Sequence, residues 1–277
     1  MRQYLTLKSG HTLCIHDTPG DQGTIIAVHG LTGNYKQLEH FQEAFTGRYR
    51  FISYDVRGRG NSDPASTDTS IRAHAEDLLE LVETLDIKAP ILMGYSMGAY
   101  ICAWVASKLT QVKALILLDG AGEPDETSRK LVLPSLKRLE GVYPSEQKYV
   151  SEVKELYTKL GVSWNDVLAE NVKYDVKQID TGWEHKSESL LIEQDFESFY
   201  SFMPTEVCSR ITCKTFLLIA TGKIANQSPL FREEGYFKTR ESIKHVQVYD
   251  MNVNHYELVF NEQPLIVSQI EAFLEVK

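Results

Sequence analysis

The chain has 277 residues, 43% of them hydrophobic and 24% charged, a composition that excludes disorder over its whole length. With 29 Lys and Arg against 38 Asp and Glu, its net charge of −9 makes it a poor general binder of nucleic acid or anionic membranes, so neither is expected as a partner. Its four cysteines predict neither a disulfide framework nor a metal site. The N-terminus lacks the apolar run of a signal peptide and no segment has the length of a spanning helix, so we expect a cytoplasmic protein.

Short apolar runs alternate with helical patterns along most of the chain, which predicts βαβ units and a mostly parallel sheet. Residues 2–8 and 11–17 are expected to form a hairpin that turns at Ser9-Gly10. Further strands are predicted at 24–29, 50–55, 90–94, 112–118, 214–220 and 245–249, and helices at 70–85, 97–109 and 264–276.

The interval 121–208 breaks this alternation. It contains helical patterns near 127–140, 145–160, 164–172 and 187–202, and no convincing strand. Because it is inserted between two predicted sheet strands, we expect a helical cap over 121–208 and a core domain made of 1–120 and 209–277. Most of its many aromatic residues should form the cap's own core, and the remainder, with Trp164 and Trp183 as candidates, should line a ligand pocket.

A G-x-S-x-G sequence, Gly94-Tyr95-Ser96-Met97-Gly98, lies between a predicted strand and a predicted helix. This context predicts a tight, strained turn that lifts the Ser96 hydroxyl out of the sheet edge and places it at a helix N-terminus. The alternative is a plain glycine-rich turn between a strand and a helix. The motif therefore makes Ser96 the candidate nucleophile.

A serine nucleophile needs amide donors for the oxyanion and a base for its proton. The Met97 N–H is one expected donor, and the Leu31 N–H, in the loop after strand 24–29, is the other. His255 is the predicted base, because it follows the last strand at the sheet edge where sites gather. The alternative for His255 is a histidine of a surface loop, and His29 is expected to hold its own loop rather than to act as the base.

These features together resemble the α/β-hydrolase superfamily. The resemblance rests on the strand order, the His29-Gly30 loop, the Asp55–Asp63 segment (DVRGRGNSD), the Gly94–Gly98 turn and the late histidine. It covers nearly all of the chain, with 121–208 in the position of the variable cap. It implies an α/β fold, in which a mostly parallel sheet is flanked by helices and carries an inserted helical cap.

The acid of the triad departs from the superfamily's usual pattern. Members commonly carry Asp or Glu just after the strand that ends here near Gly222, but residues 222–228 read GKIANQS, where Asn226 could orient a histidine without supplying charge. Some members place the acid after the preceding sheet strand, and that position is Asp119. We expect Asp119 to be the acid. Alternatives are an Asp119 that only anchors its loop, with Glu123, Asp125, Glu233 or Asp250 as the acid.

The resemblance implies acyl transfer to water, because a serine rather than an aspartate at position 96 argues against dehalogenase and epoxide-hydrolase chemistry. We expect hydrolysis of a small ester or lactone with an apolar or aromatic group, without a metal or organic cofactor, and with Tyr95 beside the alcohol part. Two alternatives stay open. One is a C–C bond hydrolase or perhydrolase with the same triad, and the other is a weakly active ligand-binding protein. The sequence leaves the oligomeric state undetermined.

Overall fold

An eight-stranded sheet forms the centre of the computed structural model, which describes residues 2–225 and 227–276. Its strand order is β1-β2-β4-β3-β5-β6-β10-β11. The N-terminal hairpin is antiparallel, and β2 pairs antiparallel with β4, whereas all later pairs are parallel. The strands are β1 (Arg2–Thr6), β2 (Thr12–Thr18), β3 (Thr24–Val28), β4 (Arg50–Tyr54), β5 (Ile91–Tyr95), β6 (Ala114–Leu118), β10 (Lys214–Ala220) and β11 (Val246–Met251).

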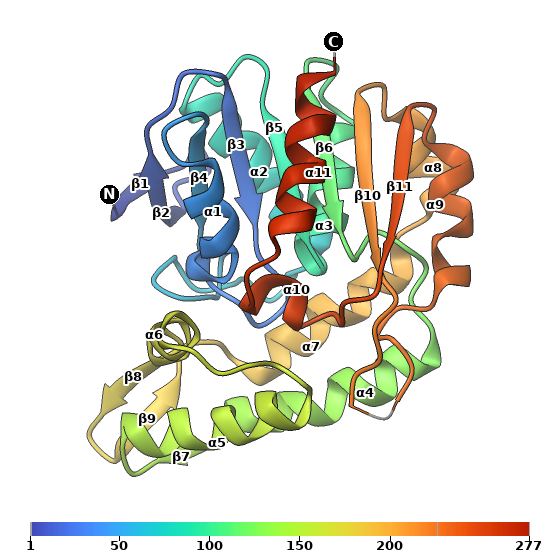
Figure 1. The fold of residues 1–277 in the computed structure, drawn as a ribbon. Helices are drawn as coiled ribbons and strands as arrows, with labels where there is room; N and C mark the ends of the chain where they lie inside the picture. The colour runs from blue at the N-terminus through green and yellow to red at the C-terminus, as the bar shows by residue number, and fades with distance from the viewer. Residues whose placement is uncertain (1, 226, 277) are drawn as a thin grey trace.

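Helices cover both faces of this sheet (Figure 1). On one face lie α2 (Ile71–Thr84), α3 (Met97–Ala106), α8 (Pro204–Val207) and α9 (Phe237–Ser242); on the other lie α1 (Glu39–Phe45), α10 (Glu257–Phe260) and α11 (Pro264–Glu275). Side chains that alternate along a strand enter opposite layers, so Leu92 packs in the first while Ile91 and Met93 pack in the second. Central strands buried on both faces explain the continuous apolar runs of the sequence.

The predicted strands and helices of the sheet domain are all present, with ends that differ by a few residues. The helix predicted over 70–85 begins after Ser70, whose hydroxyl accepts a hydrogen bond from the Ala73 N–H and so caps the helix. Four short helices, α1, α8, α9 and α10, were not expected.

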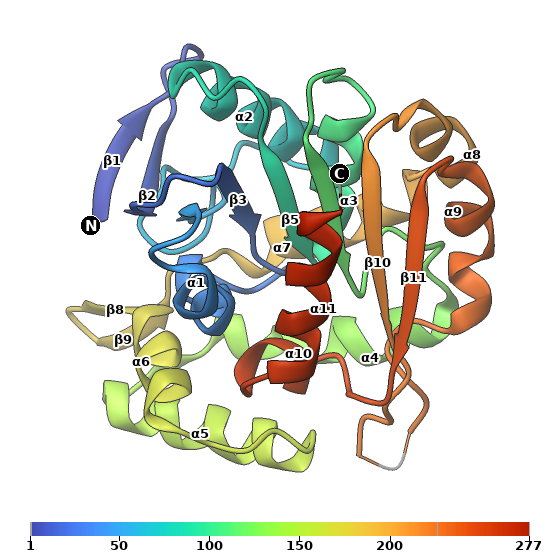
Figure 2. The ribbon, with the colours of Figure 1, turned by 45° about the horizontal axis from the view of Figure 1, so that its top comes forward.

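Between β6 and β10 the chain forms α4 (Glu126–Leu136), α5 (Glu146–Lys159), α6 (Asp166–Tyr174) and α7 (Ser189–Glu197), close to the predicted helical ranges. The expectation that this interval has no strand is wrong. A small antiparallel sheet forms from β7 (Val142–Tyr143), β9 (Gly182–His185) and β8 (Val176–Ile179). The turn between β8 and β9 has two residues and is followed by Gly182, whose φ of 144° suits glycine. In Figures 1 and 2, α5, α6 and this sheet lie together beyond the lower end of the large sheet.

The segment 203–208 lies apart from α5, α6 and the small sheet. Its helix α8 lies beside α9 on one face of the large sheet (Figure 1). The division into a core of 1–120 and 209–277 and a cap of 121–208 stays a prediction. Among the described residues, no helix is both long and apolar enough to cross a membrane.

Candidate active site

Ser96 lies at the turn from β5 to α3, with a φ of +53° that non-glycine residues rarely adopt. Glycines on both sides make this turn possible. A Cβ at Gly94 would collide with the Gly98 carbonyl, and one at Gly98 would collide with the Val28 carbonyl. The strand and the helix therefore pass close to each other, as the sequence pattern predicts, and the strained backbone presents the Ser96 side chain at the end of the sheet.

Three side chains form a continuous hydrogen-bonded chain at this edge of the sheet. His255 Nε2 lies 3.1 Å from Ser96 Oγ, and His255 Nδ1 lies 2.7 Å from Asp119 Oδ2. All three are buried, with exposures of 6% for Ser96, 3% for His255 and 0% for Asp119. The structure thus brings together the nucleophile, base and acid candidates, with bond lengths suited to proton transfer.

Asp119 follows β6 with a φ of +48°, and its carboxylate has fixed partners. Oδ1 accepts hydrogen bonds from the Ala220 N–H at 3.0 Å and the Tyr236 hydroxyl at 2.8 Å. These bonds compensate for burial of the charge and leave Oδ2 to face the histidine. The contacts explain how an acid after β6 reaches a histidine after β11.

The other acid candidates lie elsewhere. Glu123 pairs with a surface lysine, and Asp125 caps α4 and pairs with Arg232. Glu233 and Asp250 are exposed. Asn226 lies outside the described residues.

His255 is held by its neighbours. Its backbone carbonyl accepts a hydrogen bond from the Tyr95 hydroxyl at 2.9 Å, and the two rings pack with centroids 4.8 Å apart. The Phe231 ring and the Tyr256 ring meet the imidazole edge-on, at centroid distances of 5.5 and 5.4 Å. These contacts fix the imidazole plane between Ser96 and Asp119, which proton transfer from Ser96 to the imidazole would require.

The loop after β3 carries the predicted oxyanion donor Leu31. The Gly30 carbonyl accepts hydrogen bonds from His29 Nδ1 at 2.7 Å and the Gly33 N–H at 3.1 Å. The Gly30 C=O and the Leu31 N–H belong to one trans peptide, so they point in opposite directions. The Leu31 N–H therefore points away from His29 and Gly33. Among the described residues, neither the Leu31 nor the Met97 N–H has a hydrogen-bond acceptor.

His29 holds this loop, as the sequence indicates, because its two ring nitrogens are both occupied. The Val56 N–H donates to Nε2 at 3.0 Å, so Nδ1 carries the proton that is donated to Gly30. Burial lowers the pKa of His29 to about 3, which keeps the ring neutral.

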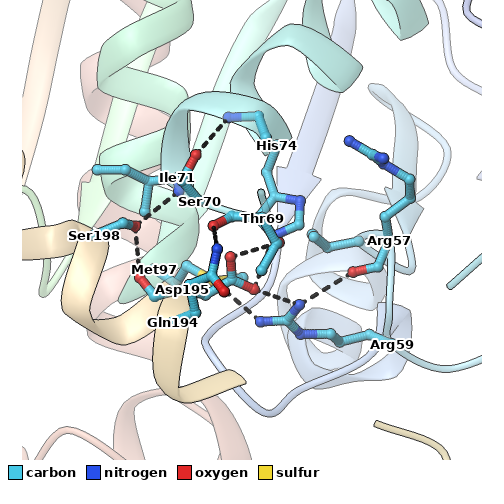
Figure 3. Close-up of polar contacts among 12 residues, drawn as sticks. Arg57, Arg59, Thr69, Ser70, Ile71, His74, Met97, Gln194, Asp195 and Ser198 are labelled. Carbon is cyan, nitrogen blue, oxygen red and sulfur yellow. Dashed lines mark hydrogen bonds and ion pairs between the residues drawn. The ribbon is translucent and has the colours of Figure 1, made fainter. Parts of the chain in front are cut away.

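Arg59 lies beside both predicted oxyanion residues. Its Nε donates to the Leu31 carbonyl at 3.0 Å, and its Nη2 lies 3.7 Å from Met97 Sδ. Its Nη1 pairs at 2.7 Å with Asp195 Oδ2 on α7. In Figure 3 the Asp195 carboxylate lies among Arg59, His74 and Thr69, with distances of 3.0 Å to His74 Nε2 and 2.7 Å to Thr69 Oγ1.

The Asp195 carboxylate is fully buried, and burial alone would raise its pKa. The charges of Arg59 and His74, with the hydrogen bonds from His74 and Thr69, outweigh that effect and lower the pKa well below its usual value. This buried cluster therefore joins α7 to the oxyanion loop.

A cavity of about 170 Å³ has Ser96 and His255 in its wall. Tyr95 and Leu31 also contribute to that wall. Apolar side chains from the inserted segment and from the loop after β10 make up most of the remainder: Leu131, Val132, Leu136, Leu156, Leu160, Phe196, Phe199, Ile224, Leu230 and Phe231. Such a lining suits a small, mainly apolar ligand.

The two tryptophans predicted to bind substrate do not line this cavity. Trp164 precedes α6, with the ammonium of Lys154 above its ring, and Trp183 pairs with Tyr143 inside the small sheet. Packing within the inserted segment accounts for both positions, and this cavity gives no support to the prediction of Trp164 and Trp183 as substrate contacts.

Among the polar side chains of the cavity wall, Arg138, Tyr157 and Tyr256 were not predicted as site residues from the sequence. Arg138 lies in a charged stretch, Lys137-Arg138-Leu139-Glu140, that reads like a solvent-exposed helix end. Tyr256 directly follows His255, and this proximity was the one local signal for it.

The comparisons with known proteins agree with this fold. A family model described as the alpha/beta hydrolase fold matches residues 23–155. The AB hydrolase superfamily protein YisY of Bacillus subtilis is 32% identical over 124 residues, which cover 44% of this chain and 46% of that protein. The 3-oxoadipate enol-lactonase 1 of Acinetobacter baylyi is 28% identical over 102 residues, covering 36% of this chain and 38% of the relative.

A solved structure of an E-2-(acetamidomethylene)succinate hydrolase superposes with a TM-score of 0.86 at 18% identity, covering 100% of this chain and 99% of that one. The chain has the alpha/beta hydrolase fold, and its residues 23–155 are similar to that family. In sequence it matches less than half the length of these curated relatives.

Proposed function

We propose that this protein is a serine hydrolase that cleaves a small carboxylic ester or lactone through an acyl-enzyme. The observation that carries the proposal is the hydrogen-bonded chain Ser96–His255–Asp119 at the wall of an apolar cavity. Hydrolase chemistry is common to the superfamily, and a relative named as a lactonase supports the narrower class.

In the first half of the reaction, His255 Nε2 takes the proton of Ser96 as the hydroxyl oxygen attacks the substrate carbonyl. Asp119 holds the imidazole with its proton on Nδ1 and stabilises the imidazolium that forms. The Leu31 and Met97 N–H groups donate to the carbonyl oxygen as it becomes negative. Collapse of this intermediate breaks the ester C–O bond, and His255 gives its proton to the departing alcohol.

In the second half, His255 removes a proton from water, and the resulting hydroxide attacks the acyl carbonyl. The tetrahedral intermediate forms in the same oxyanion site, and its collapse releases the acid and returns the proton to Ser96. The segment 121–208 acts as the cap that encloses the substrate, and Tyr95 contacts it from the sheet side. We expect the enzyme to act on this substrate in the cytoplasm.

The test is a panel of p-nitrophenyl esters and small lactones, together with a fluorophosphonate probe that reacts with activated serines. We expect an initial burst of p-nitrophenol and labelling of the wild-type protein, and neither in the Ser96→Ala variant. Absence of turnover on the whole panel, with no labelling of Ser96, would contradict the proposal.

A further inference from the structure

A cationic side chain in the wall of the cavity has only neutral partners. Arg138 lies in the short 3-10 helix that follows α4 (Lys137–Glu140). Its Nη1 donates to the Ser135 carbonyl at 2.6 Å, and its Nη2 donates to Thr32 Oγ1 at 2.9 Å. No carboxylate of the described residues lies within 4.0 Å of its guanidinium. Because a partly buried charge is costly without a counter-charge, a cation here suits an anionic ligand.

Two tyrosines beside Arg138 have hydroxyl groups with no hydrogen-bond partner among the described residues. Tyr157 on α5 and Tyr256 before α10 both line the cavity, and their ring centroids lie 6.0 Å apart. Burial raises the pKa of both hydroxyls, so each remains an O–H donor at neutral pH. Tyr95 and Tyr236, by contrast, have acceptors in the His255 carbonyl and in Asp119, whereas the Tyr54 hydroxyl is buried without a partner among the described residues.

The acidic group that influences Arg138 electrostatically, Asp175, does not neutralise it. Asp175 has an electrostatic influence on the guanidinium but forms no ion pair with it, and its Oδ1 instead accepts a hydrogen bond from Asn34 at 2.8 Å. Burial raises the pKa of Asp175 to about 7, so this carboxyl is only partly ionised at neutral pH. The positive charge of Arg138 thus remains available to a ligand.

We propose that Arg138, Tyr157 and Tyr256 form a subsite for a carboxylate group carried by the substrate. A guanidinium with two hydroxyl donors matches the acceptor oxygens of one carboxylate. The subsite is close to the reacting atoms, because the Tyr256 ring contacts His255. The cavity of about 170 Å³ limits the substrate to a small molecule, such as the monoester of a short dicarboxylic acid. This assignment rests on the proposed function, since it names the substrate class of the same site.

Binding to the Ser96→Ala variant tests the subsite without requiring turnover. Monomethyl glutarate carries one carboxylate, whereas dimethyl glutarate has the same chain and none, so their affinities can be compared by isothermal titration calorimetry. We expect the monoester to bind at least ~10-fold tighter than the diester, and Arg138→Gln in this background to remove that preference. Equal affinities, no binding of the monoester, or a preference that survives Arg138→Gln would overturn the assignment.

Matched variants separate recognition of the carboxylate from a merely structural role. Arg129→Gln changes another arginine of the inserted segment, which pairs with Glu126 and Glu197 outside the cavity, and should leave the preference unchanged. Thr32→Val removes one hydrogen bond of Arg138 but not its charge, so the preference should persist. If Arg138 served only to hold the loop, Thr32→Val and Arg138→Gln would weaken both esters equally, which would overturn the assignment.

The tyrosines provide a finer test. Tyr157→Phe and Tyr256→Phe each remove one hydroxyl donor, and each should weaken binding of the monoester by roughly 3- to 10-fold while the diester changes little. Arg138→Lys should restore part of the preference lost in Arg138→Gln, because it returns the charge without the planar fork. If the tyrosine variants bound both esters as tightly as the parent does, the hydroxyl groups would not belong to the subsite.

The same pair of esters distinguishes failure of the subsite from failure of the proposed function. If wild-type protein turns over neutral p-nitrophenyl esters while its Ser96→Ala variant shows no carboxylate preference, the subsite is wrong and the hydrolase stands. If the variant prefers the monoester while no ester or lactone is ever turned over, the cavity binds carboxylates and the hydrolase proposal is wrong.

Discussion

The two sides of the cavity are built in different ways. On the sheet side, Ser96, Asp119 and His255 each follow a parallel strand, so strand pairing fixes their separation before any loop packs. On the opposite side, Arg138 and Tyr157 come from two helices of the inserted segment, and their positions depend on how that segment folds over the sheet. Under the proposed function, the chemistry depends on the sheet and the choice of substrate depends on the inserted segment.

The Arg59–Asp195 ion pair joins these two regions (Figure 3). Asp195 comes from α7, while His74 and Thr69 hold its carboxylate from the sheet domain. Both charges are almost fully buried, with side-chain exposures of 1% and 0%. Because an unpaired charge at this position would be costly, the pair favours one placement of α7 against the oxyanion loop.

Loss of the nucleophile or the base on the sheet side should have the largest effect. Ser96→Ala and His255→Ala should each lower kcat for p-nitrophenyl butyrate by at least ~10⁴-fold, because the two side chains act as one proton-transfer unit. Steady-state kinetics measures the loss, and thermal unfolding serves as the control for folding. A variant that folds like the wild type and keeps a tenth of its activity would contradict the assigned roles.

Replacement of the acid should have the next largest effect. Asp119→Asn should lower kcat by up to about 10⁴-fold, since an amide cannot hold the imidazole in the required tautomer or stabilise its charge. Glu123→Gln, which changes an acid of the same loop that faces Lys238, should retain nearly full activity. If Asp119→Asn kept nearly full activity and Glu123→Gln lost it, the acid would not be Asp119.

Disruption of the link between the two regions should affect stability first. Asp195→Ala leaves the Arg59 charge buried without its partner and should lower the free energy of unfolding by about 3–5 kcal/mol in urea titrations. Glu197→Ala, on the same helix, removes a half-exposed partner of Arg129 and should cost at most about 1 kcal/mol. Similar losses for the two variants would mean that the buried pair does not secure α7.

The pH dependence of stability should report on Asp175 beside the predicted carboxylate subsite. Burial raises the pKa of this carboxyl from 3.8 to about 7, so the folded state retains its proton more strongly than the unfolded state. Its contribution to stability is therefore present below about pH 4 and is lost as the pH rises to about 7. In Asp175→Asn, the midpoint of urea unfolding should therefore depend less on pH between about 4 and 7 than in the wild type. If the midpoints of the variant and the wild type changed with pH in parallel, Asp175 would not titrate in this range.

The sequence predicts the sheet side well because its signals are local. The glycines around Ser96, the short apolar strands and the residues that follow them indicate where each side chain emerges. The expectation that Asp119 is the acid also needed the resemblance to the superfamily, and the structure places Asp119 next to His255, 136 positions away. Signals for the inserted segment are weaker. Trp164 and Trp183 are of a residue type that often lines pockets, but they pack within that segment. The strands β8 and β9 are too short to be told apart from the helical patterns around them.

Arg138 is the opposite case: a cavity residue that the sequence did not indicate. A charged residue at a helix end is normally solvated, and only the packing of the insertion places this one at the cavity. The interior contacts of a segment between two sheet strands depend on residues far apart in the chain, and local patterns do not record them.

The most direct test of the central claim is to trap the covalent intermediate. Wild-type protein mixed with p-nitrophenyl butyrate and quenched in acid should show, by intact-protein mass spectrometry, an added butyryl group that peptide mapping assigns to Ser96. Asp119→Asn should accumulate the same adduct more slowly, and Ser96→Ala should not form it. Turnover of the ester without an adduct, or with an adduct on another residue, would contradict the account.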